Sequence, residues 1–202
     1  MTSQPNIVKN CAVIILAAGQ SSRLGQPKQL LKYQNKTLLQ HAIDTAKQSF
    51  VKAIVVVLGS NADAILSGID ASAIHLVKNE DWQSGMASTI RCGILALQTL
   101  NSDTDAAILM VCDQPFVSVD LLNSLLERQK ETGKPIIASQ YGDSIGTPAL
   151  FHKQFFSELI GLSGDTGAKK IIARNGDLLA AISFPQGRID IDTIDDYEAL
   201  GK

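Results

Sequence analysis

Short apolar runs alternate with amphipathic segments along this chain, and no other feature limits its fold as strongly. Ala53–Leu58 is almost entirely β-branched and apolar, and Ala106–Cys112 is apolar throughout. Runs of this length and composition are typical of strands that are buried on both faces of a sheet. Four further strands are expected over Ala12–Leu16, Ile74–Val77, Ile136–Ser139 and Leu178–Ile182.

The segments between these runs predict helices. Met86–Leu100 places Ile90, Ile94 and Leu97 at helical spacing on one face. Helices are also expected over Thr37–Phe50, with Thr37 as its N-cap, and over Asp63–Leu66, Val119–Lys130, Lys153–Leu159, Lys169–Ala173 and Asp195–Leu200. Strands that alternate with helices predict an α/β fold, in which a mostly parallel sheet is covered on both faces.

Two polar segments directly follow predicted strands. The first strand stops at Ala17-Ala18-Gly19, and the loop after it contains Arg23 and Lys28, five residues apart. Small residues expose backbone amides, and nearby cations attract a polyphosphate. Asp113 follows Ala106–Cys112 directly. Because ligands of such sheets bind at the carboxyl ends of the strands, we expect both segments in one site, with Asp113 as a candidate Mg²⁺ ligand.

The loop after the first strand matches neither of two widespread phosphate-binding motifs. A Walker loop has four residues between its glycines and then Lys and Ser or Thr. Here five residues separate Gly19 from Gly25, and Gln26 follows. The dinucleotide fingerprint needs three glycines at fixed spacing, whereas this loop has two. The alternative interpretation is a Gly/Ser loop with incidental charges.

A longer pattern is more specific. From Leu16 to Lys28, Leu-Ala-Ala-Gly is followed by Arg23, Gly25 and Lys28, and this segment resembles the signature of nucleotidyltransferases that activate sugar phosphates, terpenoid precursors and molybdopterin. Further segments resemble the molybdenum cofactor cytidylyltransferase branch of that superfamily; they are Asn79–Arg91, Cys112–Pro115, Gly146–Phe151, Gly164–Ala168 and Asp190–Tyr197. Leu24 and Ile194 depart from the pattern, where Met and Pro are usual, but neither change removes a chemical group.

The resemblance implies a single-domain three-layer sandwich with the Rossmann-like nucleotide-diphospho-sugar transferase fold. It also implies Mg²⁺-dependent transfer of CMP from CTP to the phosphate of a molybdopterin-type cofactor, with release of pyrophosphate. Arg23 and Lys28 would stabilise charge on the triphosphate, and Asp113 and Asp192 would bind the metal. The nucleotide-binding residues implied are Leu16, Ala17, Ala18, Gly19, Gly25, Gly85, Met86 and Ser88. The product would pass to a molybdoenzyme or its chaperone.

Several roles have a structural alternative. Asp113 could instead cap the turn that Pro115 favours. In Asp-Ile-Asp, strand alternation would place Asp190 and Asp192 on one face, so either could be the second metal ligand. Asp192 or Thr193 could instead cap a helix.

The base-recognition segment and the acceptor-side segments are equally open. Gly85–Ser88 could be only a helix start capped by Ser84, and Arg91 faces either the acceptor or the rim of the core. Gly146-Thr147-Pro148 and Gly164–Ala168 resemble acceptor-side elements, but their composition alone predicts Gly-rich turns.

The donor and the reaction class also have alternatives. Guanylyl members of the superfamily usually have glycine where this chain has Ala18, and the extra methyl favours the smaller base of CTP. The nearest alternative is transfer from GTP or another NTP to a different phosphorylated acceptor, such as a sugar phosphate. A non-catalytic nucleotide-binding module is a second. A metal-dependent glycosyltransferase would usually have Asp-x-Asp where this chain has Cys112-Asp113-Gln114.

Length and composition fit one domain over residues 1–202, with its core from about residue 11 to 200. A net charge of −2 argues against a broad nucleic-acid or anionic-membrane surface. The three cysteines and three histidines are dispersed, which argues against a disulfide framework or a zinc site and favours buried thiols. Without a signal-like segment or an apolar run of about 18 residues, the chain is expected to be cytoplasmic.

Overall fold

The computed structural model describes residues 7–21, 23–100 and 102–201. Its strands are β1 Cys11–Ala17, β2 Lys32–Tyr33, β3 Lys36–Thr37, β4 Ala53–Leu58, β5 His75–Lys78, β6 Ala106–Val111, β7 Ile136–Tyr141, β8 Ser144–His152 and β9 Leu179–Ser183. Its α-helices are α1 Leu38–Gln48, α2 Ala62–Leu66, α3 Met86–Leu100, α4 Val119–Thr132, α5 Phe156–Ile160, α6 Lys169–Arg174 and α7 Ile194–Leu200. All six predicted strands and all seven predicted helices are present, with shifts of up to three residues at their ends.

Seven strands form one sheet in the order β5-β4-β1-β6-β8-β7-β9, and β2 and β3 form a separate small hairpin. β1 pairs in parallel with β4 on one side and with β6 on the other. The chain therefore extends the sheet outward from β1 in one direction and then returns to extend it in the other. The loops after β1 and β6 lie at this change of direction, which is where ligands of open α/β sheets bind.

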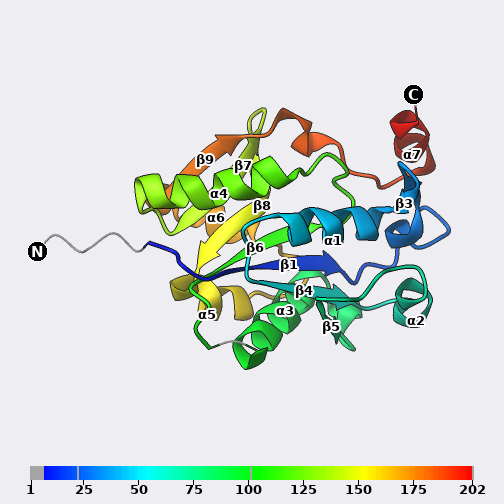
Figure 1. Ribbon diagram of the computed structural model, residues 1–202, viewed down its shortest axis with the longest axis horizontal. Helices are drawn as coiled ribbons and strands as arrows, with labels where there is room; N and C mark the ends of the chain where they lie inside the picture. The colour runs from blue at the N-terminus through cyan, green and yellow to red at the C-terminus, as the bar shows by residue number, and fades with distance from the viewer. Residues whose placement is uncertain (1–6, 22, 101, 202) are drawn as a thin grey trace, which may run out of the picture.

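Helices cover both faces of the sheet (Figure 1). Alternate residues of β1 point to opposite faces, as the two-residue period of a strand requires. Val13 and Ile15 belong to the buried cluster that includes residues of α1, α2 and α4. Ile14 and Leu16 belong to the cluster that includes residues of α3, α5 and α6. The result is the expected three-layer α/β sandwich with a mostly parallel sheet.

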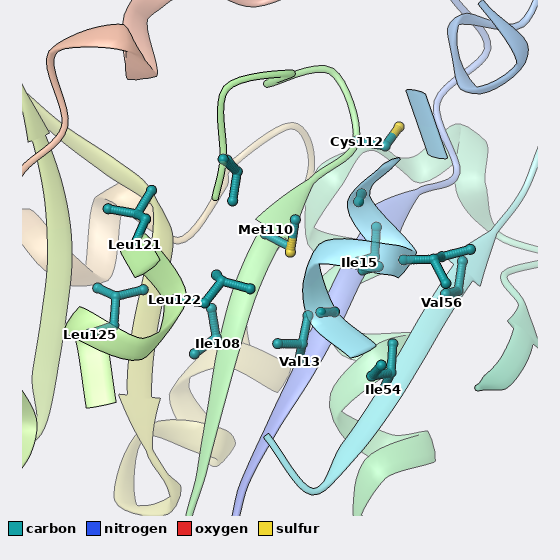
Figure 2. Packing of buried hydrophobic residues seen from close by; sticks show 14 of the residues in the cluster. Val13, Ile15, Ile54, Val56, Ile108, Met110, Cys112, Leu121, Leu122 and Leu125 are labelled. Carbon is teal, nitrogen blue, oxygen red and sulfur yellow. The ribbon is translucent and has the colours of Figure 1, made fainter. Parts of the chain in front are cut away.

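Packing between β6 and α4 holds the sheet in place near the carboxyl end of β6. Ile108 and Met110 on β6 face Leu122 on α4, and all three side chains are fully buried (Figure 2). α4 begins at the N-cap Ser118, whose side chain accepts a hydrogen bond from the backbone N–H of Leu121. The strand that ends just before Asp113 is therefore held by a well-packed layer.

β8 was not predicted and corrects one interpretation. Gly146-Thr147-Pro148 is part of this strand and is not a turn. β8 runs antiparallel to both β6 and β7. Its pairing with β7 passes from Ala149 directly to Gly146, so Thr147 and Pro148 have no ladder partner and form a bulge. The glycine and proline that obscure the strand in the sequence are accommodated by that irregularity.

A third apolar cluster fastens the C-terminal segment to the loop after β1. It is formed by Leu24, Leu31, Leu38 and Ile191, with Tyr197 and Leu200 packed against it. α7 carries a capping box in which Thr193 and Asp196 satisfy each other's backbone groups. Thr193, and not Asp192, is therefore the helix cap.

The cysteines of the described parts of the chain form no disulfide. Cys11 and Cys112 are buried and Cys92 is partly exposed, and all three are free. Burial raises the pKa of the Cys112 thiol to about 12, and the negative charge of Asp113 acts in the same direction, so the thiol is uncharged at neutral pH. Within the described ranges, no helix combines the length and apolar character needed to cross a bilayer.

Candidate active site at the carboxyl ends of β1 and β6

The loop after β1 is shaped by small residues. Ala18 packs against the end of β4 so closely that a Cβ on Gly59 would lie 2.7 Å from the Ala18 carbonyl oxygen. A Cβ on Gly19, in contrast, would meet no atom within 4 Å, so the chain is open to a ligand there. Gly25 has a φ of +66°, a left-handed conformation that favours glycine. The loop is thus anchored on the sheet side and open on the solvent side.

Gln29, which the sequence did not single out, secures this loop from inside. It lies in the 3₁₀ turn Lys28–Leu30 and is 1% exposed. Its Nε2 donates to the carbonyl oxygens of Ala17, at 2.8 Å, and of Gly19, at 3.0 Å. Occupying these two carbonyls fixes the direction of the intervening peptides. The only signal in the sequence was a polar residue directly after Lys28.

Replacing Gln29 by Met should loosen the loop, because two buried hydrogen bonds are lost without a change in side-chain length. We expect a stability loss of about 1–3 kcal/mol and weaker binding of a polyphosphate ligand at the loop. Thermal unfolding and nucleotide titration would measure both. Gln98→Met, which alters an exposed glutamine on α3, serves as the control. Wild-type ligand affinity in the Gln29 variant would show that other contacts fix the loop.

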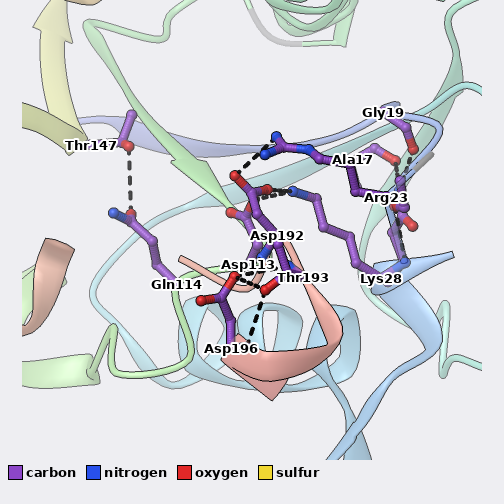
Figure 3. Close-up of polar contacts among 12 residues, drawn as sticks. Ala17, Gly19, Arg23, Lys28, Asp113, Gln114, Thr147, Asp192, Thr193 and Asp196 are labelled. Atoms are coloured by element: carbon purple, nitrogen blue, oxygen red, sulfur yellow. Dashed lines mark hydrogen bonds and ion pairs between the residues drawn. The ribbon is translucent and has the colours of Figure 1, made fainter. Parts of the chain in front are cut away.

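The catalytic candidates meet beside this loop (Figure 3). Lys28 Nζ donates to Asp113 Oδ2, and it lies 2.9 Å from Asp192 Oδ1. Arg23 Nη2 contacts the other oxygen of Asp192 at 3.3 Å. The Lys28 and Asp113 side chains are only 18% and 14% exposed, whereas Arg23 is 69% exposed. The structure therefore brings together the four charged residues that were expected to bind the triphosphate and the metal.

Asp192 lies near the C-terminal end of the chain, far from Lys28 in sequence. The backbone N–H of Ile191 donates to the carbonyl oxygen of Asp113 at 3.0 Å, and the Ile191 side chain is fully buried. This contact places Asp192 next to Lys28. The Asp190–Asp192 segment is not a strand, so the expected strand alternation was wrong. Of the two aspartates in this segment, Asp192 forms an ion pair with Lys28, and none is found between Asp190 and Lys28.

The charges of the cluster are coupled. Burial opposes the charged form of Lys28, but the negative charge of Asp113 and hydrogen bonds to Asp113 and Asp192 raise the pKa of its amine above the usual value. Although Asp190 is exposed as a residue, partial desolvation raises the pKa of its carboxyl, and the charge of Asp113 adds to this effect. A cation bound here would relieve the repulsion among these carboxylates.

The residues present fit a divalent cation. Asp113 Oδ1 is buried and has no hydrogen-bond partner, although Oδ2 is paired. A buried carboxylate oxygen without a partner is unfavourable, and a metal ion or a substrate group would satisfy it. The described residues contain no cluster of three or more His, Cys, Asp or Glu side chains suited to a metal. Mg²⁺ commonly uses one or two carboxylates with substrate phosphates and water, which is what this site offers.

A pocket of about 430 Å³ opens beside the loop. Leu16, Ala18 and Gly19 line one side, and Gly85 and Met86 line another. Of the expected nucleotide-binding residues, the structure thus gathers these five around one space. Ala17 lies behind them with its carbonyl bound to Gln29. Gly25 lies in the adjoining loop.

The start of α3 borders this pocket. Gly85 has a φ of +93°, and a Cβ there would collide with Asp165. Ser88 is 4% exposed; its hydroxyl donates to the carbonyl oxygen of Gly85 and accepts from Asn79 Nδ2, each at 2.8 Å. Ser88 therefore lies behind Gly85. α3 begins at Met86, so Gly85 directly precedes the helix and Ser84 is not its cap; the Ser84 hydroxyl donates to Asp81.

Three other residues of this region have contacts that the sequence did not reveal. Arg91 donates to the carbonyl oxygens of Ile160 and Leu162, which settles its position at the rim of the core. Trp82 and Asp165 line the pocket, although neither was expected to. Their position depends on contacts between distant segments, such as the bond from the Ala87 N–H to the Gly164 carbonyl.

Comparison with known proteins agrees with this geometry. A model of the MobA-like NTP transferase domain matches residues 13–178. Nicotine blue oxidoreductase of Paenarthrobacter nicotinovorans is 31% identical, over 93% of this chain and 94% of that protein. Molybdenum cofactor cytidylyltransferase of Escherichia coli (strain K12) is 25% identical, over 91% and 92%.

Solved structures show the same relationship. The crystal structure of Rv0371c from Mycobacterium tuberculosis H37Rv has a TM-score of 0.83 and 30% identity, covering 96% of this chain and 97% of that one. A complex of Rv0371c with manganese has a TM-score of 0.79 and 28% identity, covering 95% and 98%. The sequence match, the sheet order and the loop after β1 lead to one conclusion: the chain belongs to the MobA-like NTP transferase family of nucleotidyltransferases.

Proposed function

We propose that this protein is a cytoplasmic, Mg²⁺-dependent cytidylyltransferase that transfers CMP from CTP to the phosphate of a molybdopterin-type acceptor. The observation that carries the proposal is the cluster at the carboxyl end of β6. There Asp113 keeps one buried oxygen unpaired while Lys28 links its other oxygen to Asp192. A charge cluster of this kind, beside a loop open to a polyphosphate, suits phosphoryl-group chemistry.

The reaction needs no protein nucleophile. An oxygen of the acceptor phosphate attacks the α-phosphorus of CTP, the bond from that phosphorus to the bridging oxygen of the β-phosphate breaks, and pyrophosphate leaves. Asp113 and Asp192 would hold Mg²⁺, which supplies charge neutralisation on the phosphate oxygens. Lys28 and Arg23 stabilise the negative charge that develops around the α-phosphate. The loop and the pocket beside it orient the nucleotide for in-line attack.

The assignment of CTP rests on the pocket wall. Ala18 lines the pocket and is 3% exposed, and a Cβ on Gly59, the residue after β4, would lie 2.8 Å from its methyl carbon. Its methyl group narrows the space on that side, which favours a pyrimidine over a purine. The cytidylyltransferase relative supports the same donor. The manganese complex of Rv0371c supports a divalent metal, and Mn²⁺ would be accepted by the same oxygen ligands.

The proposals for the acceptor and for the destination of the product rest on the family relationship. A molybdopterin-type phosphate agrees with the cytidylyltransferase relative, and the product would then pass to a molybdoenzyme or its chaperone. The name of another relative, nicotine blue oxidoreductase, suggests oxidoreduction as a different reaction class. Against it, the loop after β1 has two glycines where a dinucleotide fingerprint has three.

Thermal unfolding with CTP, GTP, UTP or ATP, each with Mg²⁺, tests the donor. A nucleotide at about a hundred times its dissociation constant adds about 2.7 kcal/mol of stability. For a domain of this size that raises the unfolding midpoint by roughly 5–10 °C. We expect the shift with CTP, and we expect pyrophosphate release when a molybdopterin-type acceptor is added.

The other outcomes separate the alternatives. A shift with GTP alone would refute the argument from Ala18 and retain the reaction class. Nucleotide binding without pyrophosphate release for any acceptor would indicate a non-catalytic module. Turnover with a sugar phosphate, and none with a pterin phosphate, would move the enzyme to another acceptor class.

A further inference from the structure

The last strand of the main sheet, β9, has an open edge. Within the described residues, β9 pairs with β7 and with no other strand, so no strand lies beside the backbone groups on its outer side. Natural sheets protect such edges with charged side chains, proline or a covering segment. The five residues of β9, Leu-Ala-Ala-Ile-Ser, contain neither a charge nor a proline. This edge is therefore able to accept a further strand.

The strand at the opposite edge of the sheet, β5, differs in this respect. Lys78 is its last residue, and Lys78 Nζ forms an ion pair with Glu80 Oε1 at 2.9 Å. Charged side chains on an edge strand disfavour the addition of another strand, because a neighbouring backbone would have to desolvate them. The contrast between the two edges of one sheet favours β9 as the edge that takes a partner.

α4 lies beside β9 (Figure 1), and residues of both line a groove of about 640 Å³. Ala181, the middle residue of β9, and Ile182 line it from the strand. Asp120, Ser124 and Arg128 line it from the helix. These three residues are spaced by four, which places them on one face of α4. Along the groove, this face is negative at one end, uncharged in the middle and positive at the other end.

The charges of this helix face complement those of a second copy of the same chain. Asp120 and Arg128 lie four residues from Ser124, on opposite sides of it. A two-fold axis between the Ser124 residues of two copies would make the α4 helices antiparallel and place each Asp120 opposite an Arg128. An interface with two-fold symmetry is self-complementary in this way. Within one molecule, Arg128 contacts Glu131 at 3.1 Å, but both side chains are exposed, so this ion pair contributes little and can be exchanged.

We propose that β9 and α4 form the interface of a homodimer with two-fold symmetry. The two β9 strands pair in antiparallel orientation and join the two seven-stranded sheets into one continuous sheet. The two α4 helices lie antiparallel on the same face of that sheet. One axis perpendicular to the sheet produces both arrangements, because it reverses the direction of the strand and of the helix together. Backbone hydrogen bonds between the strands provide affinity, and the two charge pairs fix the register.

Sedimentation velocity of the full chain at concentrations from about 1 to 100 µM tests the interface. We expect the wild type to dimerise. Asp120→Arg and Arg128→Glu should each raise the dimer dissociation constant at least about tenfold, because each change replaces two attractive contacts by two repulsive ones. The double variant Asp120→Arg/Arg128→Glu should regain the wild-type dissociation constant within about threefold. An equimolar mixture of the two single variants should form a heterodimer, because the charges of one chain then complement those of the other.

Two charge reversals outside the groove serve as controls and should leave the dimer intact. Lys130→Glu changes an exposed residue of α4 that does not line the groove, and Asp63→Arg changes an exposed residue in the first turn of α2. Circular dichroism and the unfolding midpoint would confirm that every variant folds. Hydrogen exchange reports on the strand directly: the β9 amides of the wild type should exchange more slowly at high than at low protein concentration, and those of the single variants should not.

Several results would overturn the inference. A wild type that stays monomeric at about 100 µM would do so and would leave the edge of β9 to a strand of another protein. Single variants that dimerise like the wild type, or a mixture of them that stays monomeric, would show that the two charges do not face each other. A dimer whose β9 amides exchange as fast as those of the monomer would place the interface elsewhere. No nucleotide enters these measurements, so their outcome is independent of the proposed function.

Discussion

Asp113→Asn should abolish nucleotidyl transfer and leave the protein folded. The amide has the size of the carboxylate but lacks its charge, so both the attraction for a divalent cation and the ion pair with Lys28 are lost. Metal-dependent charge stabilisation contributes several kcal/mol to such transition states, so turnover should fall about 10³-fold or more. Pyrophosphate release measured against Mg²⁺ or Mn²⁺ concentration gives the result.

The control for Asp113→Asn is Asp177→Asn, which removes an equal charge from an exposed residue. Asp177 lies just before the amino end of β9, whereas Asp113 follows the carboxyl end of β6. It should retain wild-type turnover. Circular dichroism and the unfolding midpoint would confirm that both variants fold. Unchanged turnover in Asp113→Asn would refute the metal assignment, whatever the donor nucleotide proves to be.

Lys28→Met should lower both turnover and stability. Removing a single group that stabilises transition-state charge typically reduces turnover by about 10²–10³-fold. The same change leaves Asp113 and Asp192 without the cation between them, close to Asp190. We expect a stability loss of about 1–3 kcal/mol, which lowers the unfolding midpoint by roughly 5 °C. Steady-state kinetics and thermal unfolding measure the two effects separately.

A divalent cation distinguishes the two roles of Lys28. Mg²⁺ or Mn²⁺ should raise the unfolding midpoint of Lys28→Met more than that of the wild type, because it replaces the missing positive charge. It should not restore turnover. Lys52→Met, at an exposed position before β4, should match the wild type in both measurements. A Lys28 variant with normal turnover would remove the residue from the proposed mechanism.

The β1 and β6 segments illustrate what sequence patterns predict well. Apolar runs over 12–16 and 106–112 predict buried strands because they are short, and because a strand inside a parallel sheet is covered by helices on both faces. The polar residues that follow them are then fixed at one edge of the sheet. The placement of Lys28 near Asp113 could therefore be anticipated from local patterns and the general properties of parallel sheets.

β8 and the Asp190–Asp192 segment illustrate the limit. The glycine and the proline of Gly146-Thr147-Pro148 disfavour a strand, and pairing of β8 with β6 on one side and β7 on the other stabilises it. The C-terminal segment has no strand of its own. It is placed by one buried isoleucine and one backbone hydrogen bond to Asp113.

The sequence by itself determined the α/β class, six of the seven strands of the main sheet, the helices, and the family, because burial period and residue order are local properties of the chain. Tertiary structure alone decided that Asp192 pairs with Lys28 where Asp190 does not, that Gln29 secures the loop after β1, and that Lys169 contacts the Tyr141 ring. Each of these contacts joins residues that have no fixed spacing in the sequence. They become neighbours only when the sheet order and the packing of its layers bring them together.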